Sequence, residues 1–374
     1  MKKKKKYTFR KFTNDVHLWL GLGSGIILFL VCLSGTILTF EEEIKSAFIE
    51  EFEVEAASDL IPVEALATIL ESEGEVTRVE ISSAELPYEF KVKTSAEDRR
   101  GTTFYVNQYT GEYQQTPESS LDGFFMSMFK LHRWLLLDSS IGRPIVGVAS
   151  IIFLFISISG IILWFPKKWK WKNFKSGFKI KFSAKWKRVN HDLHNTLGFY
   201  ACIFLVVMTL TGLCWSFEWY REGASQVLGT NVFNRGGGPT FESEADFLES
   251  EKMTIAQVHE VVSTELNYKG STSISFPTSE SDVFKIRKTS EERFSPVVAD
   301  ELVLDLDGQV LHKEIFSEKP LNVQVASLIK PIHTGTIYGT FSKIVYFIAC
   351  LIATSLPITG TLIWWNKRKK KEKK

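Results

Sequence analysis

The stretch that decides the fold runs from His191 to Tyr220 and reads HDLHNTLGFYACIFLVVMTLTGLCWSFEWY. Its part from Leu197 to Phe217 contains no charged residue over about 21 positions. At about 1.5 Å rise per residue, a helix of this length crosses a hydrocarbon core of about 30 Å. His191 and His194 stand at its start and share one helix face, because they are three residues apart. The stretch predicts a membrane span with imidazoles at one end.

Three further stretches have similar length and apolarity: 16–40, 141–165 and roughly 341–365. Four spans predict an integral membrane protein, although the mean hydropathy of −0.01 does not reveal it. The remaining residues lie mainly in two blocks, 41–131 and 221–330, each about the size of one small domain. We therefore expect a mixed membrane protein, with a four-helix transmembrane bundle and two water-soluble modules.

Three strongly basic segments flank the spans: 2–11, 167–188 and 367–374. The positive-inside rule predicts that all three lie in the cytoplasm, so that both soluble blocks are extracytoplasmic. The lysines favour anionic membrane lipid as a partner. We do not expect nucleic-acid binding, because the basic runs lie beside the spans. Tryptophans interleave with the lysines of 167–188, which predicts a segment lying on the membrane surface.

The predicted order of segments follows directly from these boundaries. It is a basic N-terminus 1–15, a first span 16–40, a module 41–131, a histidine segment with the second span 132–166, a basic link 167–190, a third span 191–220, a module 221–330, a histidine segment with the fourth span 331–365, and a basic tail 366–374.

The two halves of the chain read as repeats of one unit. Aligning His17 with His194 sets HLWLG over HNTLG and, without a gap, Gly35 over Gly212. Each soluble block also has the order helix, then strands. We expect helix 63–72 with strands 77–82, 88–94 and 102–107, and helix 255–266 with strands 271–276, 283–288 and 302–305. The sequence therefore predicts a bundle of two duplicated halves, each with an α+β module.

Five of the seven histidines cluster at span ends: His17, His191, His194, His132 and His333. Duplicated halves with this topology relate by a pseudo-twofold axis along the membrane normal. Under that symmetry His17 faces His194 on the cytoplasmic side, and His132 faces His333 on the outer side. Two facing imidazoles suit the iron of haem b, whose apolar macrocycle fits a bundle core. We expect two b-type haems, with these four residues as axial ligands.

Some assignments stay open. His191 is an alternative to His194 as the iron ligand, or a hydrogen-bonding partner of a propionate or an imidazole. Arg133 and Arg143 are candidates for pairing with a propionate or an anionic substrate, and Arg143 is equally suited to anchoring at the interface. A single interfacial histidine is more often a snorkelling or hydrogen-bonding group than a ligand. Five histidines at symmetry-related places favour ligation.

Several motifs resemble the PepSY-associated transmembrane helix family: HRWLLL followed by GRPIVG and SGIILW, HDLHNTLGFY followed by TG, IHTGTIYG followed by TGTLIWW, and the NQYTGE turn. That family includes PiuB-like iron-regulated membrane proteins and FoxB-like inner-membrane ferrisiderophore reductases. The resemblance covers nearly the whole chain. It implies a bacterial inner membrane, PepSY modules in the periplasm and b-type haem. His17, His191, His194, His132 and His333 match the family's histidine positions.

The resemblance implies an oxidoreductase that reduces a ferric siderophore in the periplasm and so releases Fe(II). The reaction needs no acid–base triad, and none is visible in the sequence. No GxGxxG fingerprint follows a predicted strand. We therefore expect an external electron donor, either a membrane quinol or a separate cytoplasmic reductase.

Two other functions are compatible with the sequence. The first is a transporter of iron, haem or siderophore that uses the histidines as transient ligands. Transporters usually have broken helices and polar sites at the midplane, and these spans show neither apart from Pro357. The second is a non-enzymatic sensor or regulator that binds a partner through its PepSY modules.

Overall fold

The structure is a computed structural model that describes residues 7–50, 52–95, 97–98, 101–117, 119–233, 241–243, 252–277 and 282–372. Lysines 2–6 and residues 373–374, which belong to the predicted basic N-terminus and tail, lie outside the described residues. The chain forms two compact units. The membrane unit contains residues 1–43, 121–232 and 326–374, and the sheet unit contains residues 44–120 and 233–325.

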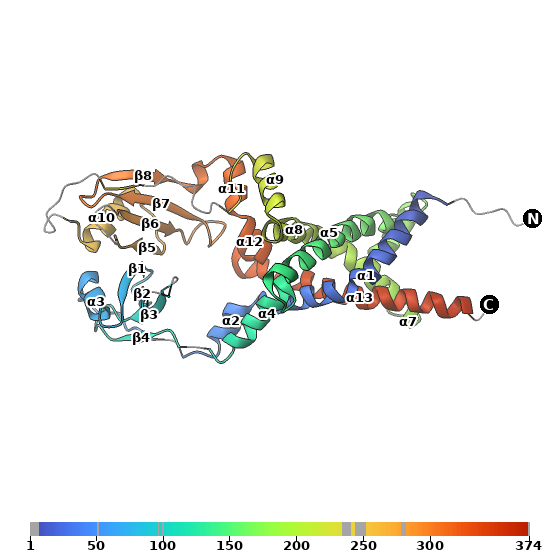
Figure 1. Ribbon diagram of the computed structural model, residues 1–374, viewed down its shortest axis with the longest axis horizontal. Coiled ribbons are helices and arrows are strands. Elements are labelled where there is room, and N and C mark those ends of the chain that lie inside the picture. Colours follow the sequence, from blue (N-terminus) through green and yellow to red (C-terminus); the bar gives the residue numbers. More distant parts are fainter. Residues whose placement is uncertain are drawn as a thin grey trace, which may run out of the picture. The chain divides into compact units, whose positions relative to one another are not determined.

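Four long apolar helices form the membrane unit: α1 (Phe9–Leu38), α5 (Ser139–Trp164), α8 (Gly198–Ser216) with the helical turns before it, and α13 (Gly339–Glu372). Each is long and apolar enough to cross a membrane. Figure 1 shows them running side by side, and both α1 and α8 pack against α5 and α13. The helix α13 continues through Pro357. The protein is therefore a membrane protein with a helical bundle.

Shorter helices complete the membrane unit. They are α4 (Asp122–Trp134), α6 (Trp171–Gly177), α7 (Trp186–Asp192), α9 (Glu218–Leu228), α12 (Ile329–Thr334) and the 3₁₀ turn η4 (Thr336–Tyr338). Two more, α2 (Glu41–Ser46) and α11 (Leu321–Ser327), cross the boundary between the units. Between α7 and α8 the chain forms a π-helical turn, η1 (Leu193–Leu197), so that one continuous helical span runs from Trp186 to Ser216.

Two of the short helices turn the chain back towards a long one. α4 ends in two left-handed leucines, Leu135 and Leu136, with φ of 57° and 60°. The turn is tight, because a Cβ on Gly142 of α5 would lie 2.0 Å from the carbonyl oxygen of Trp134. α12 ends at Gly335, whose φ of 79° suits glycine. Each turn places the last residues of a short helix against the bundle.

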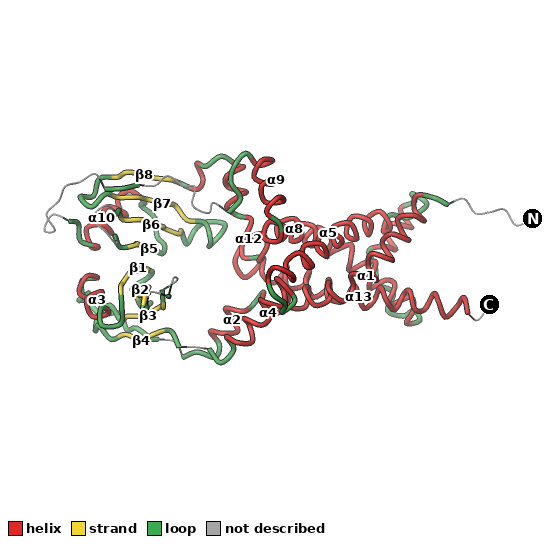
Figure 2. The backbone as a smooth tube through the Cα atoms, in the orientation of Figure 1, coloured by secondary structure: helices red, strands yellow, loops and turns green. Residues whose placement is uncertain are grey.

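The sheet unit contains one antiparallel sheet of eight strands in the order β4-β3-β2-β1-β5-β6-β7-β8. The strands are β1 (Glu75–Ile81), β2 (Tyr88–Lys93), β3 (Thr102–Val106), β4 (Tyr113–Gln115), β5 (Thr272–Ser275), β6 (Phe284–Thr289), β7 (Ala299–Leu304) and β8 (Val310–Glu314). Figure 2 shows that the described strands lie in this unit alone. The unit also contains α3 (Val63–Leu70), α10 (Ile255–Glu265) and the 3₁₀ turn η3 (Phe316–Glu318).

The core of the sheet unit arises from strict alternation along the strands. In β2, Tyr88, Phe90 and Val92 are buried and the residues between them are not. These side chains pack in one cluster with apolar residues of α3 and α10. The expected helices and strands are present within two residues of their expected ends, except that the third strand of the second block, β7, begins three residues earlier. β4 and β8 are short strands that the sequence analysis did not predict.

The sequence did not predict that the two blocks share one sheet. β1 of the first block pairs with β5 of the second, in register from Arg78 opposite Ser275 to Ile81 opposite Thr272. The backbone N–H of Ile255 at the start of α10 also donates to the carboxylate of Glu64 in α3. Because both blocks contribute to one buried cluster, neither block has a separate core.

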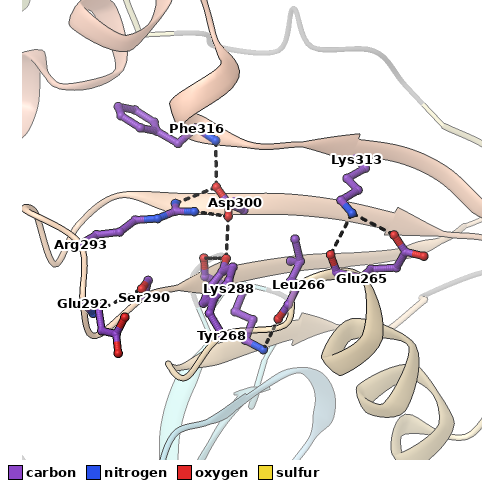
Figure 3. Close-up of polar contacts among 10 residues, drawn as sticks. All are labelled: Glu265, Leu266, Tyr268, Lys288, Ser290, Glu292, Arg293, Asp300, Lys313 and Phe316. Carbon is purple, nitrogen blue, oxygen red and sulfur yellow. Dashed lines mark hydrogen bonds and ion pairs between the residues drawn. The ribbon is translucent and has the colours of Figure 1, made fainter.

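A buried polar network braces the second half of the sheet (Figure 3). The carboxylate of Asp300, fully buried, accepts from the guanidinium of Arg293, the hydroxyl of Tyr268 at 2.7 Å and the backbone N–H of Phe316 at 2.8 Å. Burial by itself raises the pKa of the Asp300 carboxyl, but these donors together hold its pKa below the usual range. The ammonium of Lys288 donates a hydrogen bond to the carbonyl oxygen of Leu266 at 2.7 Å. The network thus joins two strands to the segment after β8.

We expect Asp300→Asn to destabilise the sheet unit by about 3 kcal/mol, because it leaves a mostly buried guanidinium without its carboxylate. Protease susceptibility of the purified full chain, measured against urea, reports this loss. Arg287→Gln is the matched control, since Arg287 pairs with Glu301 across β6 and β7 with both side chains exposed, and such pairs contribute little.

The network also predicts a dependence on pH. A carboxyl with a lowered pKa in the folded state stabilises the fold above its unfolded pKa, and that contribution is lost as the pH falls through the folded value. The stabilisation by Asp300 is therefore present at neutral pH and disappears below about pH 4. Acid unfolding of Asp300→Asn should depend less steeply on pH than that of the parent protein. Parallel acid unfolding curves would contradict this prediction.

Candidate functional site

The first candidate site lies at the end of the bundle where α1 begins. His17 is two turns into α1, and His194 lies in the π-helical turn η1 that precedes α8. The centres of their imidazole rings are 6.3 Å apart, with the ring planes at 87°. The two residues are 177 positions apart in the chain (194 − 17), so their proximity comes from packing of the bundle.

The second candidate site uses residues outside the long helices. His132 and His333 lie in the last turns of α4 and α12, the two short helices that fold back on the bundle. Their ring centres are also 6.3 Å apart, with the planes at 56°. His132 contacts Gly35 of α1, which is eighteen residues, or about 27 Å of helix, beyond His17. The two imidazole pairs therefore lie near opposite ends of the bundle.

Backbone carbonyls select the tautomer of the second pair. Nδ1 of His132 lies 2.9 Å from the carbonyl oxygen of Val31, and Nδ1 of His333 lies 2.9 Å from that of Met208. A carbonyl oxygen only accepts, so both Nδ1 atoms carry the proton and donate it. Nε2 of each ring then presents a lone pair, which is the form that binds a metal.

Hydroxyl groups select the same tautomer in the first pair. Nδ1 of His17 lies 2.9 Å from Oγ of Ser159, and Nδ1 of His194 lies 2.9 Å from Oγ1 of Thr359. The Ser159 hydroxyl donates to the carbonyl of Ile156, and that of Thr359 donates to carbonyls of its own helix. These hydroxyl oxygens are thus free to accept from Nδ1–H. All four rings therefore carry the proton on Nδ1 and a lone pair on Nε2.

A glycine follows each group that holds an imidazole, by one residue after Ser159 and Thr359 and by four after Val31 and Met208. Its missing side chain leaves room for the ring. A Cβ built on it would meet Cε1 of the imidazole at 3.0 Å for Gly35 and His132, 3.5 Å for Gly160 and His17, 2.8 Å for Gly212 and His333, and 3.2 Å for Gly360 and His194. The sequence shows the four Ser-Gly or Thr-Gly pairs but not which histidine each one receives. The structure shows that each pair contacts a histidine from a neighbouring segment.

The structure separates His194 from His191. His191 lies in α7, its side chain is 53% exposed, and its Nδ1 is 3.6 Å from the carboxylate of Asp192. His194 comes one residue into η1, where the wider π-helical turn changes the direction of the side chains. His194 is therefore the residue that faces His17, and His191 is directed elsewhere. Sequence reasoning did not predict the π-helical turn.

The two candidate arginines differ in their surroundings. The guanidinium of Arg133 lies over the rings of Phe129 and Trp134, at 5.4 and 5.3 Å from their centres. Arg143 is exposed near the start of α5. A residue that sequence reasoning did not single out for the site is Trp215, whose ring centre lies 5.2 Å from that of His333. Its place three residues after Gly212, at the end of a span, was the only sequence signal for it.

The two imidazoles of each pair fit a metal whose other ligands come from elsewhere, such as the iron of a porphyrin. A metal–imidazole bond is about 2 Å and the ring centre lies about 1 Å behind the nitrogen, so two imidazoles on one metal have ring centres about 6 Å apart. Both pairs have this spacing. In the described part of the chain, no group of three or more His, Cys, Asp or Glu side chains could hold a bare metal ion. Two imidazoles alone do suit haem iron, which needs only two axial ligands.

The comparison with protein families agrees with the motifs. The family model for the PepSY-associated TM region matches residues 15–367. The chain belongs to this family. The match overlaps all four spans and includes both halves of the sheet, together with His17, His132, His194 and His333. Among curated proteins, none matches the chain at a significant level.

The glycine contacts make a prediction for this member of the PepSY-associated TM family. Gly212→Ala should displace His333, because the new Cβ would come within 2.8 Å of a ring whose Nδ1 is held by Met208. On the expectation that this imidazole pair holds haem, the variant should have a lower Soret absorbance per chain than the parent protein. Gly160→Ala is the matched control, since its Cβ meets His17 at an ordinary 3.5 Å. Equal haem content in both variants would contradict the prediction.

Proposed function

We propose that this protein binds two haem b groups and carries electrons across a bilayer to reduce an extracytoplasmic ferric siderophore. The observation that supports this most is the pair of imidazole sites. Each has ring centres 6.3 Å apart, and each presents two Nε2 lone pairs inside a membrane bundle. Membership of the PepSY-associated TM family agrees with a membrane role but does not by itself specify a reaction.

Four side chains hold the iron in this proposal. His17 and His194 would hold one haem, and His132 and His333 would hold the other. When bound, haem supplies an iron centre that gains and loses one electron without an open coordination position. The hydrogen bonds to Nδ1 keep the rings in one tautomer and raise the basicity of the ligands.

The proposed orientation follows from charge. The basic link 167–188 and the basic end of α13 lie in the cytoplasm of a bacterium, and the protein lies in its inner membrane. The sheet unit then lies in the periplasm. We also propose that the chain arose by duplication, which would account for the eighteen-residue step from His17 to Gly35 and again from His194 to Gly212.

The proposed substrate is a chelate in which hard oxygen donors hold Fe(III). Adding one electron gives Fe(II), which such donors bind weakly, so the metal leaves and the chelator remains intact. A quinol or a separate cytoplasmic reductase supplies the electron. Arg133 and Arg143 are candidates for holding the anionic chelate or a haem propionate near the second site. We assign no catalytic acid or base.

Transport and regulation fit the structure less well. The described spanning helices are continuous, including α13 through Pro357, whereas transporters usually place broken helices at their substrate site. A regulator that acts only through its sheet unit would have no need for four imidazoles held in one tautomer within the membrane unit. Electron transfer through haem would use both the continuous spanning helices and the four imidazoles.

A pyridine haemochrome titration of the purified protein tests the ligands. We expect two haems per chain in the parent protein and one in each of His17→Ala, His194→Ala, His132→Ala and His333→Ala. His191→Ala and His312→Ala are matched controls that should retain both, because His191 is directed away from the pair and His312 lies in β8 of the sheet unit. Protein from haem-replete cells without a Soret band would rule out the proposal.

Reduction across a membrane tests the reaction. In sealed vesicles that contain a reduced quinol pool, Fe(II) should appear outside when a ferric siderophore is added there, detected with an impermeant Fe(II) chelator. His333→Ala should abolish the signal while His191→Ala retains it. Uptake of labelled chelate without any Fe(II) outside would instead support transport.

A further inference from the structure

The basic link between α5 and α7 forms a dense positive surface on the membrane unit. All ten of its basic side chains, nine lysines and Arg188, are exposed between residues 167 and 188, and the segment contains no acid. Of these ten, all within the described residues, Arg188 is the one that pairs with a carboxylate, that of Asp192. The lysines therefore remain available to an anionic partner.

Large aromatic side chains stand among these lysines. The exposed fractions are 79% for Trp169, 76% for Trp171, 73% for Phe182 and 61% for Trp186. A water-facing surface seldom carries four such residues in so short a segment. Tryptophan and phenylalanine beside lysine are typical of segments that lie in the headgroup region of a bilayer.

The link is fastened to the bundle and is not a loose loop. The indole N–H of Trp164 and the hydroxyl of Thr196 both donate to the carbonyl oxygen of Gly177, at 3.2 and 3.0 Å. The hydroxyl of Tyr200 donates to the carbonyl of Phe178 at 3.1 Å. Trp164 also stacks on Phe199 with ring centres 3.8 Å apart. These contacts join α6 to the ends of α5 and α8.

The same contacts reach the turn that carries His194. Asp192, with its side chain 4% exposed, accepts from the backbone N–H of Lys181 at 3.3 Å and from Nε of Arg188 at 2.9 Å. It is the residue directly before η1, and Thr196 lies within η1. Anything that orders the link therefore also orders the turn that directs His194 at His17.

We propose that the link 167–188 is a binding surface for anionic phospholipid headgroups, and that their binding stabilises the turn that presents His194. The charge of the link favours an anionic partner, since its nine exposed lysines have no carboxylate partner in the segment. The aromatic side chains and the direct continuation of the link into α5 and α7 select the bilayer over a soluble acidic protein. The lipid contact is independent of the redox chemistry proposed above.

Hydrogen exchange of the full-length protein in nanodiscs tests this proposal without haem-dependent activity. We expect amides of residues 177–181 and 193–197 to exchange about tenfold more slowly with phosphatidylglycerol present than in phosphatidylcholine alone. The triple variant Lys172→Gln, Lys175→Gln, Lys179→Gln should lose this difference. The triple variant Lys367→Gln, Arg368→Gln, Lys369→Gln, at the end of α13, is the matched control for charge and should keep it.

A second variant separates lipid binding from its effect on the turn. Thr196→Val removes the hydroxyl that bonds to Gly177, so phosphatidylglycerol should still be retained in native mass spectra while the exchange of 193–197 no longer responds to it. Equal exchange in both lipids for the parent protein would overturn the proposal. Protection by soluble polyglutamate, without protection by phosphatidylglycerol, would show that the surface docks an acidic protein and would also overturn it.

Discussion

The structure of the membrane unit depends on one constraint, namely how an imidazole is held at the end of a helical bundle. A histidine in an apolar environment must place its N–H against an acceptor, because an unpaired donor there is costly. His132 and His333 use carbonyls of the neighbouring helix, and His17 and His194 use hydroxyls. In each case the other ring nitrogen, Nε2, is left with a lone pair.

The same constraint explains the glycines that follow these acceptors within one helical turn. An imidazole reaches the acceptor only if its edge lies against the backbone of the neighbouring helix, and a side chain at that position would occupy the space. At one end of the bundle the ring comes from a long helix or the π-helical turn before it. At the other end it comes from a short helix, and for this reason α4 and α12 end in left-handed residues that return the chain to the bundle.

In the sheet unit the main constraint is size, because each of the two soluble blocks is too small to bury a core by itself. Pairing β1 with β5 removes one exposed edge from each module and lets α3 and α10 share one apolar cluster. The buried carboxylate of Asp300 then ties the strand β7 to Arg293 before it and Phe316 after it. Both units thus rely on contacts between segments far apart in the chain.

The sequence by itself determined the four spans, the class of each soluble block and the residue types at the span ends. These properties are local: hydropathy, strand alternation and glycine turns act over fewer than about 30 residues. The alignment of the halves also named the pairs His17 with His194 and His132 with His333, since symmetry needs only the order of the spans.

Only the tertiary structure decided the rest. The choice between His191 and His194 depends on a π-helical turn, which changes side-chain direction without a signal in composition. The Nδ1 partners Ser159, Thr359, Val31 and Met208 lie more than 100 residues from their histidines. The seam between β1 and β5 joins strands about 190 residues apart, whose free edges could each have paired elsewhere. Such contacts follow from packing of distant segments, which local sequence patterns do not encode.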